Sequence, residues 1–251
     1  MGAFFMAVSQ HSAGNFRSKK GGCPHANFVL SLRNICVTLA GHTLKLWFAH
    51  LDTLPVRLDW LSDDEQSRVA RKGTNSLRHR QAASFTWLRE RLASALGTEP
   101  ASLVLVRDEG GKPRLVDNTT RFNLSHSGAM VALAICPSAE VGVDIEQWMK
   151  RPTDHLAEEI LSAAEMETWH TLHDGERQRW LTMVWARKEA VLKAAGQGLR
   201  IAPRTFSIHG AGLLAEDIVT CGGELWAVCN IETDVPEGYC AAVAVRPSCN
   251  P

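Results

Sequence analysis

The first group of residues that could do chemistry is a pair of carboxylates, Asp144 and Glu146, separated by Ile145. Residues two apart on a β-strand share a face, so both carboxylates would point one way while the apolar neighbours point into the core. Two carboxylates so placed repel each other unless a cation that prefers oxygen ligands binds between them. Taken alone, the pair is better explained as two acids on a solvated strand edge.

The second group is Glu189 and Lys193, which are four residues apart in a segment that predicts a helix. Such a pair is usually an ordinary surface pair worth roughly 0.2–0.5 kcal/mol. Apolar neighbours such as Trp185 and Val191 place this helix face near the core instead, and Gly196 ends the helix. A third carboxylate with a cation beside it suits a site for metal-bound phosphate.

The third group lies in the sequence Phe-Asn-Leu-Ser-His-Ser-Gly at residues 122–128, at a predicted strand–loop junction. Ser125, His126 and Ser127 could donate several hydrogen bonds to phosphate oxygens. Adjacent serine and histidine residues rarely align as nucleophile and base, and the sequence contains no Gly-x-Ser-x-Gly elbow. An anion-binding role is therefore favoured over a nucleophile, although His126 alone would be explained as a structural histidine.

Two basic features complete the set. Gly111-Lys112-Pro113 predicts a turn that holds one lysine on a restricted backbone. A basic stretch runs from Arg68 to Arg80 along predicted helices. Each feature, without the other groups, is best explained as solvated surface charge.

The hydrophobic pattern predicts the elements that must position these groups. Strands are expected at residues 43–51, 102–106, 130–136, 141–146, 205–209, 224–231 and 239–245. Helices are expected from Ser62 and Ser162, each opening a capping box, and over residues 77–96 and 176–195, each ended by a glycine. The order predicts an α+β fold of two similar halves. We expect an extension at residues 1–42, poorly ordered or accessory, and halves at residues 43–138 and 139–251.

The composition excludes several classes of protein. The 251 residues include 27 basic and 27 acidic side chains, a balance that argues against a general nucleic-acid-binding protein. The seven cysteines form no Cys-x-x-Cys pair, which argues against a disulfide framework or structural zinc and favours a reducing cytoplasm. No apolar run approaches the roughly 20 residues needed to cross a membrane. Any polyanion should therefore be bound locally, by a few cations in one pocket.

The ordered motifs G-K-P, F-N-L-S-H-S-G, V-G-V-D-I-E and W-x-x-K-E-A-x-x-K-A-x-G-x-G-L resemble those of the surfactin-type 4′-phosphopantetheinyl transferases. The resemblance covers about residues 43–245, with the specific motifs between residues 111 and 199. It implies a pseudo-dimer of two α+β halves, with coenzyme A bound in the cleft between them. The implied reaction transfers 4′-phosphopantetheine to a serine of an apo acyl or peptidyl carrier protein and releases 3′,5′-ADP.

The resemblance also implies a role for each candidate residue. The implied ligands of Mg²⁺ are Asp144, Glu146 and Glu189. The residues implied to bind coenzyme A are Arg80 at the 3′-phosphate, Gly111, Lys112 and Pro113 at the adenine end, and Ser125, His126 and Lys193 at the phosphates. Lys193 would also neutralise charge at the transferring phosphorus. One basic position expected near Arg68 is occupied by Glu65.

Glu189 is expected to take the proton of the attacking serine, directly or through a water. Two other interpretations use the same residues: a metal-dependent phosphodiesterase or nuclease, and a non-catalytic module that binds coenzyme A or a carrier protein. The neutral charge argues against the first, and the three intact carboxylates argue against the second. We expect a monomer, because a duplicated chain provides both sides of its own cleft.

Overall fold

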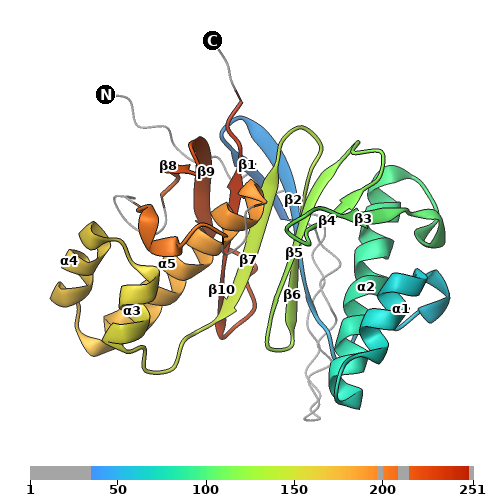
Figure 1. The fold of residues 1–251 in the computed structure, drawn as a ribbon, viewed down its shortest axis with the longest axis horizontal. Helices are drawn as coiled ribbons and strands as arrows, with labels where there is room; N and C mark the ends of the chain where they lie inside the picture. The colour runs from blue at the N-terminus through green and yellow to red at the C-terminus, as the bar shows by residue number, and fades with distance from the viewer. Residues whose placement is uncertain (1–34, 197–199, 209–214, 249–251) are drawn as a thin grey trace, which may run out of the picture.

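The computed structural model describes residues 35–196, 200–208 and 215–248, which form two four-stranded antiparallel sheets (Figure 1). The first sheet has the order β1-β2-β6-β5, with strands Ile35–Leu39, His42–His50, Met130–Cys136 and Arg121–Ser127. The second has the order β7-β10-β9-β8, with strands Val141–Gln147, Tyr239–Val245, Glu224–Ile231 and Asp217–Cys221. Strands β3 (Leu105–Arg107) and β4 (Pro113–Leu115) form a separate small sheet.

Five α-helices are described: α1 (Asp63–Ala70), α2 (Asn75–Leu96), α3 (Asp154–Ile160), α4 (Ala163–Thr171) and α5 (Asp174–Ala195). The capping boxes expected at Ser62 and Ser162 are both present, so the sequence fixes where α1 and α4 begin. Helices α2 and α5 end as expected at Gly97 and Gly196, both in the left-handed conformation that glycine adopts without strain.

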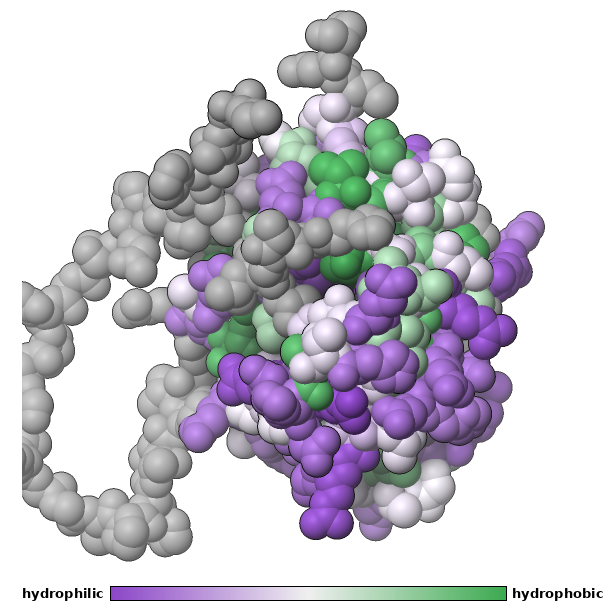
Figure 2. Space-filling view, turned by 90° about the vertical axis from the view of Figure 1, so that its left-hand side faces the viewer, coloured by the Kyte–Doolittle hydropathy of each residue, from purple (hydrophilic) through white to green (hydrophobic). Residues whose placement is uncertain are grey.

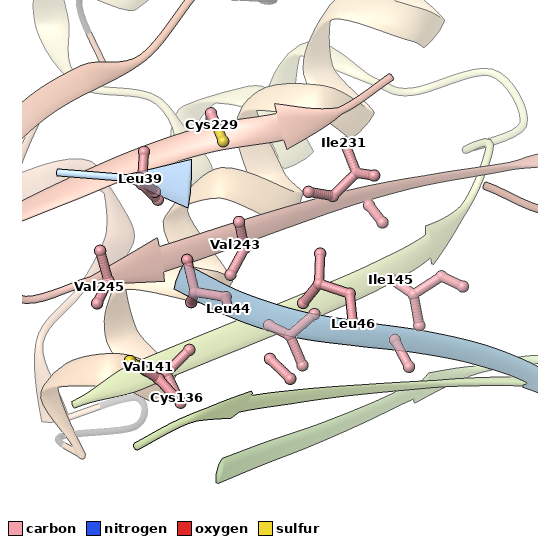
Figure 3. Packing of buried hydrophobic residues seen from close by; sticks show 14 of the residues in the cluster. Leu39, Leu44, Leu46, Cys136, Val141, Ile145, Cys229, Ile231, Val243 and Val245 are labelled. Carbon is pink, nitrogen blue, oxygen red and sulfur yellow. The ribbon is translucent and has the colours of Figure 1, made fainter. Parts of the chain in front are cut away.

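The two sheets pack face to face and each carries one long helix on its outer face. Figure 3 shows the inner core, where Leu44 and Leu46 of β2 meet Ile145 of β7 and Val243 of β10. Alternation along β6 explains the layers: Ala132 and its even-numbered neighbours face the second sheet, whereas the odd-numbered residues face α2. Helix α5 packs in the same way on the outer face of β8–β10. The predicted α+β fold of two sheet-and-helix halves is therefore confirmed.

Three local predictions differ from the structure, and two described elements had no prediction. Strand β1 lies inside the expected extension and pairs with β2, so at least residues 35–42 belong to the first sheet. The strand expected at residues 205–209 is not observed: residue 205 ends a 3-10 turn at residues 203–205, residues 206–208 form no strand, and residue 209 lies outside the described residues. The strand expected at residues 102–106 is shorter and begins at Leu105. Strand β8 and helix α3 were not predicted, because their short segments lack a clear period.

On the face in Figure 2, hydrophilic residues gather over the lower half, and apolar residues lie in small patches mainly above them. Among the helices that the structure describes, none is long and apolar enough to span a bilayer.

Buried thiols provide a first testable prediction about the fold. Burial raises the pKa of Cys229 and the pKa of Cys240 to about 12. Because the thiolate is the reactive form, we expect iodoacetamide at pH 8 to label both at least about 100-fold more slowly in the native than in the unfolded protein. Peptide mass spectrometry measures both rates, with the same protein unfolded in guanidinium chloride as the reference. Equal native and unfolded rates would contradict the packing of the second sheet.

Candidate active site

Helix α5 lies unusually close to strand β7, because residue 142 is glycine. A Cβ built on Gly142 would lie 2.0 Å from Ala190 O and 2.5 Å from Ala194 N. Any side chain here would force the helix away from the strand. The glycine therefore lets one face of α5 lie directly against the carboxylates of β7.

Lys193 and Asp144 form an ion pair at the centre of the site. Lys193 Nζ lies 2.5 Å from Asp144 Oδ1 and donates a hydrogen bond of 2.8 Å to Ser125 Oγ. Ser125 Oγ in turn donates to the same carboxylate oxygen over 2.7 Å. Asp144 is only 1% exposed, and this burial raises its pKa, while Lys193 and Ser125 act in the opposite direction. The ionised form of the buried Asp144 carboxylate is thus stabilised by the nearby cation Lys193.

Glu146 is oriented by two donors from different elements. Ser127 of β5 donates to Glu146 Oε2 over 2.9 Å, and Trp185 of α5 donates through Nε1 to Glu146 Oε1 over 2.9 Å. Burial raises the pKa of Glu146, and the neighbouring charge of Asp144 raises it further. The carboxyl group is therefore held in place on β7 while its negative charge is poorly neutralised.

Glu189 completes a cluster of three carboxylates. Burial is the main cause that raises its pKa, Lys193 lowers it, and the charges of Asp144 and Glu146 raise it again. The three acids therefore act on one another across the contact between β7 and α5. Their mutual repulsion is the feature that a bound cation would relieve.

The residues present fit a divalent cation that prefers oxygen ligands. Asp144 Oδ2 is buried and has no hydrogen-bond partner among the described residues. A buried carboxylate oxygen without a partner is costly, and Mg²⁺ takes such oxygens as ligands. Within the described part of the chain, however, no three His, Cys, Asp or Glu side chains already stand at metal-binding positions. To bind an ion, the three carboxylates would have to move closer together, and Lys193 would have to break its ion pair with Asp144.

Strand β5 separates this cluster from a second feature of the site. Asn123, Ser125 and Ser127 face β7, where they bond to Val143 N, Asp144 and Glu146, respectively. His126 points to the other face of β5 and lines a groove. The two residues expected to contact phosphates thus lie on opposite faces of one strand, because both belong to β5 instead of a loop.

The groove has a volume of about 830 Å³ and a cationic wall. It lies between α1, α2, β3 and β5. The basic residues that line it are Arg68, Arg71, Lys72, Arg107 and His126. Burial lowers the pKa of Arg107, and the charge of Arg68 lowers it further. Asp64, which also lines the groove, pairs with Arg68 at 2.8 Å and lies 4.0 Å from Arg107. Such a wall suits a phosphate-bearing ligand.

Two residues expected to bind coenzyme A already have protein partners. Lys112 Nζ donates to Val141 O over 3.0 Å and to Lys193 O over 2.9 Å. Arg80 bonds to both carboxylate oxygens of Asp52, over 2.6 and 2.7 Å, and is not among the residues lining the groove. Pro113 does line the groove, and Gly111 adopts a left-handed φ of 82° in the turn before it. The expected role of Arg80 stays a prediction.

Most of the groove has no local signal in the sequence. The basic run from Arg68 to Arg80 has the pattern of a solvated helix face, yet Arg71 and Lys72, which follow α1, line the groove together with Arg107 from a distant strand. No local pattern reveals this, because the groove forms only when β3 packs beside α1. A structural role explains why Glu65 occupies the position where a basic residue was expected. Its side chain is 5% exposed and forms an ion pair with the buried Arg89 at 2.8 Å.

Comparisons with known proteins agree with this site. Residues 140–244 match the model of the 4′-phosphopantetheinyl transferase superfamily, and residues 45–138 match that of the 4′-phosphopantetheinyl transferase N-terminal domain. The chain is 32% identical over 174 residues to 4′-phosphopantetheinyl transferase HetI of Nostoc sp., covering 65% of this chain and 73% of the relative. It is 31% identical over 132 residues to a 4′-phosphopantetheinyl transferase of Bacillus subtilis, covering 52% and 58%. A second Bacillus subtilis enzyme of this name, ffp, is 29% identical over 195 residues, covering 76% and 84%.

A carboxylate cluster beside a cationic groove suits an enzyme that acts on a phosphate-linked substrate. The chain belongs to the 4′-phosphopantetheinyl transferase superfamily, in its two-domain form. It is an enzyme that transfers 4′-phosphopantetheine from coenzyme A to carrier proteins. The family uses coenzyme A and typically Mg²⁺, a cation that prefers oxygen ligands such as the carboxylates of Asp144, Glu146 and Glu189.

Proposed function

We propose that Asp144, Glu146 and Glu189 hold Mg²⁺ during transfer to a serine of an apo acyl or peptidyl carrier protein. The observation that supports this most directly is the buried Asp144 Oδ2, which has no hydrogen-bond partner in the part of the chain that the structure describes. It lies beside two carboxylates whose pKa values are also raised. When bound, Mg²⁺ would withdraw charge from the pyrophosphate and stabilise the departing 3′,5′-ADP. The remaining steps depend on the protein's own side chains.

In this proposal the serine hydroxyl attacks the phosphorus that bears pantetheine, and the bond from that phosphorus to the oxygen of 3′,5′-ADP breaks. Glu189 takes the serine proton, directly or through a water. Lys193 leaves Asp144 to neutralise charge that develops on the phosphate oxygens. Ser125, bonded to both, would keep Asp144 oriented after that movement.

The cationic groove is the proposed site for the nucleotide end of coenzyme A. Its volume suits a nucleotide, its cations suit the 3′-phosphate, and the turn at Gly111–Pro113 reaches its edge. His126 lies in the groove on the strand that also supplies Ser125, so one strand could contact both ends of the diphosphate. In this proposal the 3′-phosphate is bound by Arg71 and Lys72 instead of the expected Arg80.

The groove assignment predicts a specific kinetic effect. Replacing both Arg71 and Lys72 by alanine should raise the KM for coenzyme A about 10- to 100-fold and change kcat by less than about threefold, because charge-assisted hydrogen bonds to phosphate are lost. Steady-state kinetics with an apo acyl carrier protein measures both constants. Arg204→Ala, at an exposed arginine of the turn at residues 203–205, is the matched control.

Dephospho-coenzyme A, which lacks the 3′-phosphate, distinguishes the two positions for that group. The Arg71→Ala/Lys72→Ala variant should lose most of the preference for coenzyme A over dephospho-coenzyme A, whereas Arg80→Ala should keep it. If Arg80→Ala loses the preference for coenzyme A and the Arg71→Ala/Lys72→Ala variant keeps it, Arg80 binds the 3′-phosphate.

The finer assignments of partner, assembly and location are also proposals. We propose a monomer, since each half supplies one wall of the contact between β5 and β7 that builds the site. A cytoplasmic location is supported by four buried cysteines of the described residues that form no disulfide, Cys136, Cys221, Cys229 and Cys240. The nuclease interpretation is not supported, because the chain is neutral and belongs to a transferase superfamily.

A further inference from the structure

One lysine of the turn before β4 forms a hydrogen bond to the C-terminal end of α5. Lys112 is buried, with its side chain 8% exposed, and its Nζ lies 3.6 Å from Glu140. That amine donates to Val141 O at the start of β7 and to Lys193 O in the last turn of α5. A single side chain from the N-terminal half therefore joins the strand and the helix that together form the carboxylate cluster.

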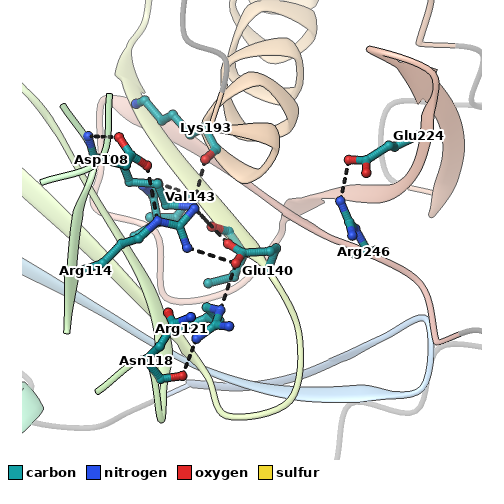
Figure 4. Close-up of polar contacts among 12 residues, drawn as sticks. Asp108, Arg114, Asn118, Arg121, Glu140, Val143, Lys193, Glu224 and Arg246 are labelled. Atoms are coloured by element: carbon teal, nitrogen blue, oxygen red, sulfur yellow. Dashed lines mark hydrogen bonds and ion pairs between the residues drawn. The ribbon is translucent and has the colours of Figure 1, made fainter. Parts of the chain in front are cut away.

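Backbone packing supports the same connection. A Cβ built on Gly110 would lie 2.8 Å from Gly196 O, so the turn touches the end of α5 directly. Figure 4 shows the surrounding network, in which Arg114 binds Asp108 and Glu140, and the carbonyl of Lys193 faces this cluster. The connection is thus part of a packed polar interface between the halves.

The carbonyl that Lys112 binds belongs to Lys193, the residue whose amine pairs with Asp144. Its backbone carbonyl lies at the helix C-terminus, where partial negative charge collects and where cationic donors are stabilising. Its side-chain amine reaches Asp144 Oδ1 and Ser125 Oγ. A shift of the carbonyl would move the amine relative to Asp144, because both belong to the same residue.

We propose that Lys112 is a positioning residue, which holds the carbonyl of Lys193 and so sets the place of the Lys193 amine against Asp144. The inference rests on the proposed function of the site. It gives the side chain of Lys112 a role other than contact with adenine, and it couples the turn beside the nucleotide groove to the group that meets the transferring phosphate. Burial lowers the pKa of Lys112 to about 8, yet an uncharged amine still has enough hydrogens for both carbonyls.

A double-mutant cycle in kcat tests the proposal. The variants are Lys112→Met, Lys193→Met and the double variant, measured with coenzyme A, Mg²⁺ and an apo acyl carrier protein. Lys112→Met should lower kcat about 10- to 100-fold and change the KM for coenzyme A less than about threefold. In the Lys193→Met background the same change should lower kcat by less than about twofold. Lys45→Met, at an exposed lysine of β2, is the control.

Two outcomes would overturn the inference while the wild type is active. One is a KM for coenzyme A raised about tenfold with unchanged kcat, which would place the side chain on the nucleotide. The other is a decrease in kcat from Lys112→Met that is as large in the Lys193→Met background as in the wild type. If Lys112→Met does not fold, the cycle can be repeated with Gly110→Ala, whose added methyl group would push the turn away from Gly196 O. The decrease in kcat caused by Gly110→Ala should also depend on the presence of Lys193. A wild type inactive on every carrier would instead overturn the proposed function and this inference with it.

Discussion

Glu189→Gln should lower kcat at least about 1000-fold while making the protein more stable. The loss is expected because the variant removes a base, worth about 100- to 10,000-fold, and one ligand of the proposed metal. The gain in stability follows from the sign of the pKa shift. Burial and two neighbouring carboxylates raise the pKa of Glu189 above its unfolded value, so its ionised form costs stability at neutral pH. A neutral glutamine removes that cost.

The pH dependence provides the check on this explanation. The stability difference between Glu189→Gln and wild type should be largest above the folded pKa of Glu189 and should disappear as the pH falls below the unfolded pKa. Thermal melts over this range measure it, with Glu167→Gln at an exposed position of α4 as the control. Mg²⁺ should raise the melting temperature of the wild type more than that of the variant. Near-normal turnover of Glu189→Gln at saturating Mg²⁺ would remove Glu189 as the base.

Gly142→Ala should have the largest effect on the fold. A methyl group at this position would lie 2.0 Å from Ala190 O, and backbone cannot move aside as a flexible side chain can. We expect a loss of about 3 kcal/mol in the free energy of unfolding and a melting temperature lower by about 6–12 °C. Activity should fall too, since α5 must move away from β7 and take Glu189 and Lys193 with it.

Gly73→Ala is the matched control, because a Cβ there would meet nothing within 4 Å. It should change the melting temperature by no more than about 2 °C. Similar melting temperatures for Gly142→Ala and Gly73→Ala would contradict the close approach of α5 to β7, and with it the way the carboxylates are brought together.

The sequence could predict elements whose signals are local. The capping boxes at Ser62 and Ser162 and the glycines at 97 and 196 determined where four helices begin or end. The alternation around Asp144 placed its apolar neighbours in the core as expected, with Val143 and Ile145 fully buried. Spacing also put Glu189 and Lys193 on one helix face, and the structure brings that face to Asp144.

Other features depend on contacts between distant segments and had no local signal. The basic run of α1 looks like any solvated helix face until Arg107 of β3 joins it in the groove. Lys112 looks like a turn lysine, and only its contacts with Val141 O and Lys193 O show that it is buried. Ser125 and His126 are neighbours in sequence, yet strand geometry sends them to opposite faces.

The most direct test of the central claim is the intact mass of apo carrier proteins after incubation with this enzyme, coenzyme A and Mg²⁺. An acyl and a peptidyl carrier should both be tried, and Glu189→Gln and Asp144→Ala should be run beside the wild type. We expect the wild type to add one phosphopantetheine to at least one carrier and both variants to add none in the same time. Transfer that survives in both variants would contradict the assignment of the reaction to the carboxylate cluster.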